Sequence, residues 1–288
     1  MRDYLIVSDS SCDLPADLLK SWGVTCIELT FHEDNSDKEY DCSGMKPSEF
    51  YQLMRDGKVF KTAAVNFQRF RDCFVPILER GLDILYVAFS SGLSVTAATG
   101  EMVAKELMEE YPGSRVEVVD SLCASSGQGL FLSLAVQNKN NGANLEENVR
   151  LLLEKRPKIC HWFTVDDLVY LKRGGRVSST AALVGTVLNI KPVLHVDDEG
   201  HLINMSKVRG RKQSIKALVD QYRLTAEEPK GGTYFISHGD CLGDAKYLET
   251  LIREEFGHNA TVIHDVGPVI GAHSGPGTLA LFFVGSKR

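Results

Sequence analysis

The amino-acid sequence predicts an α/β protein with two domains, one built on a parallel sheet and one on a mixed sheet. In the first half, short apolar runs alternate with segments of helical spacing, which is typical of a parallel sheet buried on both faces. After residue 158 the pattern changes, because two strand-like runs flank Asp198-Glu199-Gly200 and predict an antiparallel hairpin. We therefore expect an N-terminal parallel α/β domain over residues 1–158 and a C-terminal mixed α/β domain over residues 159–288.

Local signals define the elements that we expect in the N-terminal half. Pro15 and Pro47 mark the first turns of helices, and apolar residues from Phe67 to Leu78 recur with helical spacing. Residues 32–46 are polar and predict a surface loop. The expected strands are 4–7, 24–31, 84–89 and 116–119, and the expected helices follow Pro15 or cover 47–55, 67–79, 94–111, 124–138 and 145–155.

The C-terminal half is expected to combine the hairpin with strand-helix-strand units. Its glycine-rich segment, residues 267–277, predicts a loop before the last strand. The expected strands are 159–165, 192–197, 201–208, 233–237, 260–264 and 278–284, and the expected helices are 166–171, 180–188, 211–222 and 243–256.

Composition narrows the class of protein. Of the 288 residues, 43% are hydrophobic and 24% are charged, the usual balance of a globular protein. The formal net charge is −6, whereas binding to phosphate backbones needs a basic face, so we expect no nucleic-acid partner. No run approaches the ~20 apolar residues that span a bilayer, and the N-terminus lacks the features of a signal peptide. We expect a cytoplasmic protein with at most transient membrane contact.

Metal and cofactor motifs are missing from the sequence. The seven cysteines are widely spaced without a C-x-x-C pair, so we expect reduced core residues rather than a disulfide framework or a zinc site. The sequence contains no phosphate loop, no dinucleotide-binding glycine motif and no compact His/Asp/Glu cluster. We therefore expect no metal and no cofactor.

Two hydroxyl-bearing segments are candidates for anion binding. Thr62 precedes a helix, and residues 90–94 follow a buried strand and open another helix, where free backbone N–H groups stabilise an anion. Each segment also has a plainer interpretation as a helix cap, by Thr62 or Asn66 in the first segment and by Ser91 or Ser94 in the second. Ser94 further lies in an incomplete nucleophile motif, since Thr96 occupies the last glycine position of G-x-S-x-G.

Two other segments could bind a ligand or a partner. Residues 267–277 surround His273 with glycine and proline; glycine permits close backbone approach and histidine can donate to a carboxylate. The alternative is a rigid surface turn with a solvated histidine. Basic clusters at 172–176 and 209–212 could bind an anion, dock an acidic partner or be ordinary solvated loops.

Taken in order, these segments resemble the DegV family over nearly the whole chain. The glycine-rich segment is the most specific of them, and the ordered set is far more specific than any single member. The similar segments are residues 7–10, 61–62, 90–94, 119–121, 171–176, 191–192, 238–240 and 267–277.

The resemblance implies a two-domain DegV-like fold, with a Rossmann-like N-terminal domain and a long-chain fatty acid buried between the domains. The acid would be of the palmitate, stearate or oleate class. The resemblance implies that Thr62 and Ser94 hold its carboxylate. His273, with the neighbouring Gly275 and Gly277, would belong to the same binding site.

The resemblance also implies a carrier rather than an enzyme. Family members of the fatty-acid-kinase type hand their bound acid to a separate kinase catalytic subunit, which phosphorylates the carboxylate with ATP. No catalytic residue is then expected in this chain. The residues expected to dock the kinase are Arg173, Arg176, Arg209 and Arg211.

The sequence departs from the family pattern beside both hydroxyl residues. Because Thr62 and Ser94 themselves remain, we expect carboxylate binding to persist, while the chain-length preference could differ. Ala63, Val65 and Asn66 stand where the family usually has Ser, Pro and Ser, and Val95 stands where it usually has Gly.

Two alternatives to the carrier stay open. One is a serine hydrolase that uses Ser94 with His273, and the other is a protein that binds another small anion, such as a phosphorylated metabolite. The candidate residues are hydrogen-bond donors without an obvious pair of base and nucleophile, which favours holding a ligand over transforming it.

Overall fold

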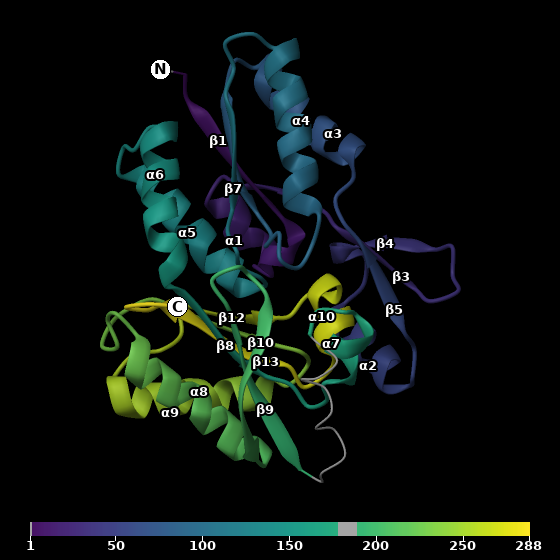
Figure 1. Ribbon diagram of the computed structural model, residues 1–288, viewed down its shortest axis with the longest axis vertical. Coiled ribbons are helices and arrows are strands. Elements are labelled where there is room, and N and C mark those ends of the chain that lie inside the picture. Colours follow the sequence, from purple (N-terminus) through teal and green to yellow (C-terminus); the bar gives the residue numbers. More distant parts are fainter. Residues whose placement is uncertain (1, 178–188) are drawn as a thin grey trace.

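A parallel sheet of four strands organises the N-terminal half of the computed structural model, which describes residues 2–177 and 189–288. Its elements are β1 (Tyr4–Asp9), η1 (Ser10–Cys12), α1 (Ala16–Ser21), β2 (Thr25–Ile27), α3 (Phe67–Glu79), β6 (Asp83–Ala88), α4 (Thr96–Glu110), β7 (Val116–Asp120), α5 (Ser126–Asn140) and α6 (Leu145–Lys155). The strand order is β2-β1-β6-β7. Helices α3 and α4 lie on one side of the sheet and α5 and α6 on the other (Figure 1). The expected parallel sheet is confirmed, and coverage on both faces explains its uninterrupted apolar strands.

Side-chain caps explain where two of these helices begin. Asn66 Oδ1 accepts a hydrogen bond from the backbone N–H of Arg69 at 2.9 Å, so Asn66 caps α3. Asn144 and Glu147 form a reciprocal capping box at the start of α6, with N···O distances of 3.1 and 3.0 Å. Each cap satisfies donors that the helix itself leaves unpaired.

A small antiparallel sheet corrects two expectations. It consists of β3 (Thr30–Glu33), β4 (Glu39–Asp41) and β5 (Phe60–Ala63) in the order β4-β3-β5, with η2 (Cys42–Gly44) and α2 (Pro47–Arg55) between β4 and β5. The single strand expected over 24–31 is wrong, because β2 and β3 divide this run between two sheets. The loop expected over 32–46 is also wrong in part, since it contains β4, whose polar residues hid the strand.

A six-stranded mixed sheet organises the C-terminal half. Its elements are η3 (Arg156–Lys158), β8 (Ile159–Thr164), α7 (Val169–Arg173), β9 (Ile190–Val196), β10 (Leu202–Arg209), α8 (Arg211–Thr225), β11 (Tyr234–His238), α9 (Leu242–Phe256), β12 (Val262–Asp265), α10 (Pro268–Ser274) and β13 (Leu279–Val284). The order is β10-β9-β8-β13-β11-β12, with only β11 and β12 parallel among these described strands. The expected hairpin and the mixed sheet are confirmed. The helix expected over 180–188 lies outside the described residues.

The glycine-rich segment is a helix over most of its length, so the expectation of a loop there is wrong. Pro268 occupies the first turn of α10, where its missing N–H costs nothing. Gly271 lets α10 lie against Tyr51, because an added Cβ would be 2.5 Å from the Tyr51 hydroxyl oxygen. Gly275, with φ of +82°, ends the helix.

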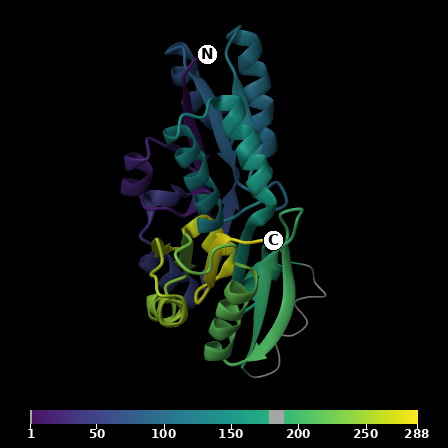
Figure 2. The same cartoon turned by 90° about the vertical axis from the view of Figure 1, so that its left-hand side faces the viewer.

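Helix α5 connects the packing of the two halves. It contacts β1 and β6 of the parallel sheet and also β8, β11 and β13 of the mixed sheet, and its residues 126–132 are all buried. Figure 2 shows the parallel sheet and its teal helices above most of the green and yellow C-terminal half. The chain passes from the first sheet to the second between β7 and β8, and the domain boundary at residue 158 stays a prediction.

The turn between β9 and β10 rests on the N-terminal half. Ser90 donates a hydrogen bond from Oγ to the Gly200 carbonyl oxygen at 2.9 Å. Gly92 lies equally close, since an added Cβ there would be 2.8 Å from the Glu199 carbonyl oxygen. The hairpin is therefore held against residues 90–92.

Candidate functional site

A cavity of about 510 Å³ lies between the two halves and is lined by residues from both. Its volume falls within the ~300–1,000 Å³ that small-molecule sites commonly have. Most of its wall is apolar, and the polar residues that line it are Thr62, Ser91, Ser94, Ser125, His161, Arg176, His273, Ser274 and Thr278. Apolar residues of the wall include Leu29, Phe89, Phe163, Leu202, Val269 and Phe282.

One face of α10 forms a long side of this cavity. Val269, Ile270 and His273 of α10 all line it, and their spacing of one, three and four residues places them on one side of the helix. Val266, just before the helix, lines the cavity as well. The face is apolar until it reaches His273 near the end of the helix. The cavity wall along α10 thus changes from apolar to polar toward its C-terminal end.

Thr62 and His273 meet at that polar end. Thr62 Oγ1 on β5 is 2.8 Å from His273 Nε2. Burial, and then the nearby Arg176 charge, lowers the pKa of His273 to about 4, so the imidazole is neutral at pH 7. Its Nδ1 is buried against Gly174 without a hydrogen-bond partner among the described residues.

This arrangement determines which group can donate to a ligand. A neutral imidazole carries one N–H, and a buried N–H without an acceptor is costly. The tautomer with the proton on Nε2 avoids this cost, because His273 then donates to Thr62 Oγ1. The hydroxyl hydrogen of Thr62 is left free to point into the cavity.

Ser94 lines the cavity just before α4. Its Oγ is 2.9 Å from Thr96 Oγ1 and accepts a hydrogen bond from the Thr96 N–H at 3.2 Å. The N-cap of α4 is Val95 and no side chain caps this helix, so the expectation that Ser94 caps it is wrong. Ser94 instead forms a local turn with Thr96 and lines the cavity. Because His273 contacts Thr62 instead, the pairing of Ser94 with His273 that a hydrolase would need is not formed among these contacts.

Arg176 supplies positive charge to the cavity. Its guanidinium donates to the Leu93 carbonyl oxygen, with Nε and Nη2 both at 3.3 Å, and to the Gly174 carbonyl oxygen. No carboxylate of the described chain pairs with it, and burial lowers its pKa. An anionic ligand would supply the missing counter-charge, whereas the docking role expected for Arg176 would require it at the surface.

The other basic candidates lie apart from this cation. Arg173 is exposed beside the Tyr170 ring, with 5.7 Å between guanidinium carbon and ring centroid, and Arg209 is exposed at the end of β10. Arg211 is only 18% exposed and pairs with Asp244 at 2.8 Å. Arg173 and Arg209 are thus accessible to a partner, whereas Arg211 is engaged in an ion pair.

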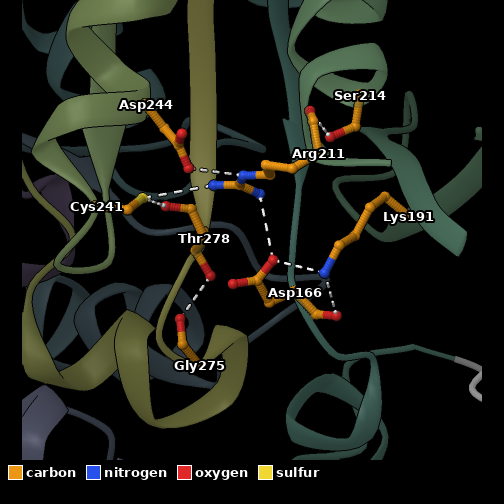
Figure 3. Close-up of polar contacts among 8 residues, drawn as sticks. All are labelled: Asp166, Lys191, Arg211, Ser214, Cys241, Asp244, Gly275 and Thr278. Carbon is orange, nitrogen blue, oxygen red and sulfur yellow. Dashed lines mark hydrogen bonds and ion pairs between the residues drawn. The ribbon is translucent and has the colours of Figure 1, made fainter. Parts of the chain in front are cut away.

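Figure 3 shows that this ion pair belongs to a larger polar cluster. Asp166 lies between Lys191, whose Nζ is 2.7 Å from Oδ1, and Arg211, whose Nη1 is 3.9 Å away. The two cations and two carboxylates of the cluster balance one another, so it is a structural network rather than an anion site.

Gly275 and Gly277 shape this region without lining the cavity. Both have positive φ, and an added Cβ would lie 2.3 Å from the Tyr170 ring at Gly275 and 2.1 Å from Asp166 Oδ2 at Gly277. Thr278 Oγ1 donates to the Gly275 carbonyl oxygen at 2.8 Å (Figure 3). Their position indicates that they hold the end of α10 rather than touch a ligand.

A second polar point in the wall was not predicted from the sequence. Ser125 lines the cavity, donates from Oγ to Asp13 Oδ2 at 2.5 Å and lies 3.0 Å from Ser237 Oγ. Burial raises the pKa of Asp13 to about 7. Asp13 is 112 positions from Ser125, and no local pattern marks such a contact.

Ser274 is another cavity residue that the sequence did not single out. It is 5% exposed and lines the cavity, yet its Oγ has no hydrogen-bond partner among the described residues. A buried hydroxyl of this kind favours a polar atom on the ligand.

Among residues 2–177 and 189–288, no group of three or more His, Cys, Asp or Glu side chains is arranged to hold a metal ion. No helix in the same residues is long and apolar enough to cross a membrane.

Comparison with known proteins gives full-length matches. The model of the DegV family, described as "Uncharacterised protein, DegV family", matches residues 4–286. A DegV domain-containing protein of Clostridium perfringens is 41% identical over 294 residues, covering 100% of this chain and 99% of the relative.

Solved structures agree with the fold. One Thermotoga maritima protein, described as revealing a fatty acid binding function, is 28% identical with a TM-score of 0.83, covering 99% of this chain and 100% of that chain. A Thermus thermophilus DegV family protein, described by its fatty acid binding, has the same identity, TM-score and coverage.

Proposed function

Because the chain belongs to the DegV family, we propose that it binds a long-chain fatty acid in the cavity between its halves and presents the carboxylate to a partner kinase. The observation that carries the proposal is the polar end of a mostly apolar cavity, where Thr62 contacts His273 and Arg176 has no carboxylate partner in the described chain. The fatty acid binding described for the Thermotoga and Thermus proteins supports this choice of ligand.

The apolar wall supplies the binding energy for the acyl tail. Burying a chain is worth ~0.8 kcal/mol per CH₂, so sixteen carbons contribute on the order of 10 kcal/mol before the cost of ordering the ligand. A flexible polar metabolite would gain nothing comparable from Phe89, Phe163 and Phe282. The composition of the wall therefore favours a lipid over the small-anion alternative.

The polar end suits a single carboxylate. Thr62 and Ser94 offer hydroxyl groups, and Arg176 offers a charged group that offsets the loss of solvent around an anion. His273 acts through Thr62, because its Nε2–H donated to Oγ1 leaves the threonine hydrogen free for the ligand. We assign Thr62, Ser94 and Arg176 to direct contact and His273 to positioning.

The proposed carrier role requires that the carboxylate end of the cavity can be reached from the surface. Ser91 and Val95 line the cavity and are also exposed, with Val95 68% exposed. The cavity thus reaches the surface beside Ser94, where a kinase could approach the carboxylate. Of the four arginines expected to dock the kinase, we keep exposed Arg173 and Arg209 in the proposal. The chain itself would carry out no chemical step.

Mass spectrometry of the purified protein tests the proposal. After denaturation, we expect fatty acids of sixteen or eighteen carbons in amounts close to that of the protein. Delipidated protein should then take up palmitate or oleate and melt at a higher temperature. Repeatedly empty protein that neither acid stabilises, together with stabilisation by a phosphorylated metabolite, would favour the small-anion alternative.

A further inference from the structure

Ser125 contributes a hydroxyl group to the wall of the cavity. Ser125 lines the cavity and is 5% exposed. Its backbone has φ of +54° and ψ of −147°, a conformation that residues with side chains rarely adopt. Ser125 therefore adopts a backbone conformation that is unfavourable for a residue with a side chain.

The position of Ser125 relative to the carboxylate end follows from α10. Asp13, which accepts the Ser125 hydrogen bond, also accepts one from the N–H of Gly267 at 3.0 Å, just before α10. Thr62 contacts His273 near the other end of that helix. Six residues of helix separate Gly267 from His273, or about 9 Å at 1.5 Å per residue.

This separation corresponds to the middle of a long acyl chain. An extended backbone of three bonds per residue advances ~3.5 Å per residue, or about 1.2 Å per bond, so ~9 Å spans about seven or eight bonds. Val269 and Ile270, on the helix between these two points, line the cavity with apolar side chains. A chain held by its carboxylate at Thr62 and running along α10 would bring its eighth or ninth carbon to the Gly267 end of the helix, where Asp13 joins Gly267 to Ser125.

The hydrogen bonds of Ser125 leave it able to accept one more. A serine oxygen has one hydrogen and two lone pairs. The hydrogen goes to Asp13, and a contact with Ser237 can use one lone pair. A plain hydrocarbon would leave the second lone pair unpaired, whereas a hydroxyl on the ligand would donate to it.

His161, a neighbouring side chain in the wall, has no free hydrogen-bond acceptor. His161 also lines the cavity, but its Nδ1 is 3.1 Å from the Ile159 carbonyl oxygen and its Nε2 accepts from the Ala124 N–H at 3.3 Å. Both of its ring nitrogens are therefore already paired. Of these two neighbouring residues, Ser125 is the one with a free acceptor.

We propose that the cavity accepts fatty acids with a hydroxyl group near the middle of the chain, and that Ser125 is the residue that recognises this hydroxyl. The inference rests on the proposed binding of fatty acids and names a substrate class within it. Ser125 acts by accepting a hydrogen bond, and no bond of the ligand is made or broken.

Competition binding with a fluorescent fatty acid tests the inference on the delipidated full chain. The probes are octadecanoic acid, 9- and 10-hydroxyoctadecanoic acid, and 17-hydroxyoctadecanoic acid, whose hydroxyl lies near the tail end. We expect the mid-chain hydroxy acids to bind at least as tightly as octadecanoic acid. The tail-end isomer should bind at least tenfold more weakly, because its hydroxyl is buried without a partner.

Ser125→Gly is the informative variant, because glycine adopts the positive φ at this position without strain. It should weaken the mid-chain hydroxy acids at least fivefold and leave octadecanoic acid within twofold. Ser133→Ala, at a serine of the same helix whose hydroxyl donates to the Leu130 carbonyl oxygen, should change neither.

The outcomes separate this inference from the proposed function. If octadecanoic acid binds but both mid-chain isomers are at least tenfold weaker, or if Ser125→Gly leaves their affinity unchanged, recognition by Ser125 is wrong and fatty-acid binding stands. If none of the acids binds, the proposed function fails and this inference fails with it.

Discussion

Thr62 Oγ1 and His273 Nε2 lie 2.8 Å apart although 211 positions separate the two residues in the chain. The contact joins β5 of the small sheet to α10, which precedes the last strand of the mixed sheet. The free hydroxyl hydrogen of Thr62 therefore depends on an imidazole from the other half of the molecule. The proposed ligand contact of Thr62 and the packing of the two halves therefore share this hydrogen bond.

Thr62→Val should weaken fatty-acid binding, because it removes the donor to the carboxylate and keeps the shape of the side chain. A hydrogen bond to a charged group is worth about 1.5–3 kcal/mol, so we expect roughly ten- to hundredfold weaker binding of palmitate. Displacement of a fluorescent fatty acid measures the change. Thr25→Val, at an exposed position of β2, is the matched control, and an equal loss in both variants would remove Thr62 from the site.

The pH dependence of stability should report the buried state of His273. Its folded pKa is about 4 and its ordinary value 6.5, so between these values the unfolded chain binds more protons. The free energy of unfolding therefore falls as pH drops from about 6.5 to 4. Asp13, with a pKa raised to about 7, contributes with the opposite sign over much of this range.

A variant isolates the histidine from these other groups. His273→Gln cannot take up the proton, so its free energy of unfolding should fall less steeply with acidification than that of the natural chain. Urea unfolding at pH 7, 6 and 5 gives both slopes. Parallel slopes would mean that His273 titrates normally in the folded protein.

Gly277→Ala should destabilise the fold by more than ~2 kcal/mol, since it combines an unfavourable positive φ with a collision. The residue has φ of +79°, and an added Cβ would lie 2.1 Å from Asp166 Oδ2. Gly113→Ala is the control, because Gly113 has φ of +84° with nothing within 4 Å of an added Cβ. Thermal unfolding of the two variants separates backbone strain from the contact, and equal losses would exclude a role for Asp166.

Charge reversal at Arg173 and Arg209 should impair transfer to a kinase and leave binding intact. Both side chains are exposed, and exposed charges act mainly on encounter with a partner. With a bacterial fatty acid kinase catalytic subunit and ATP, hydroxylamine trapping of the acyl phosphate gives the rate. We expect a severalfold lower rate that becomes less sensitive to salt.

The control for this double variant is Arg150→Glu, at an exposed arginine of α6. Its rate should match that of the natural chain. A double variant that retains the natural rate at low salt would place the kinase on another surface.

Long segments with consistent periodicity were predictable from the sequence. The helices Pro47–Arg55, Phe67–Glu79 and Leu145–Lys155 have the expected bounds, because apolar spacing and local start signals agree there. The small sheet was not predicted, since β4 has only polar or aromatic residues on an exposed strand. The helix α10 was missed because glycine usually disfavours helices, whereas here Gly271 is needed for contact with Tyr51.

The candidate site was predictable only where residues fall into a known pattern. Thr62, Ser94 and His273 were named from the resemblance, and the structure places all three in the wall of one cavity. The inward position of Arg176 depends on how the chain turns after α7, and the contact of Ser125 with Asp13 depends on tertiary packing. Neither arrangement leaves a periodic signal in the sequence.

The support beneath the β9–β10 hairpin has a practical consequence for engineering this protein. Hairpin tips usually tolerate inserted epitopes or fluorophore-bearing peptides. Residues 199–200, however, contact Gly92 and Ser90. An insertion there would separate the hairpin from residues 90–92. Gly142, just after α5, has φ of +92° and open space around an added Cβ. A biosensor for lipid uptake is therefore better grafted at Gly142 than at the hairpin tip.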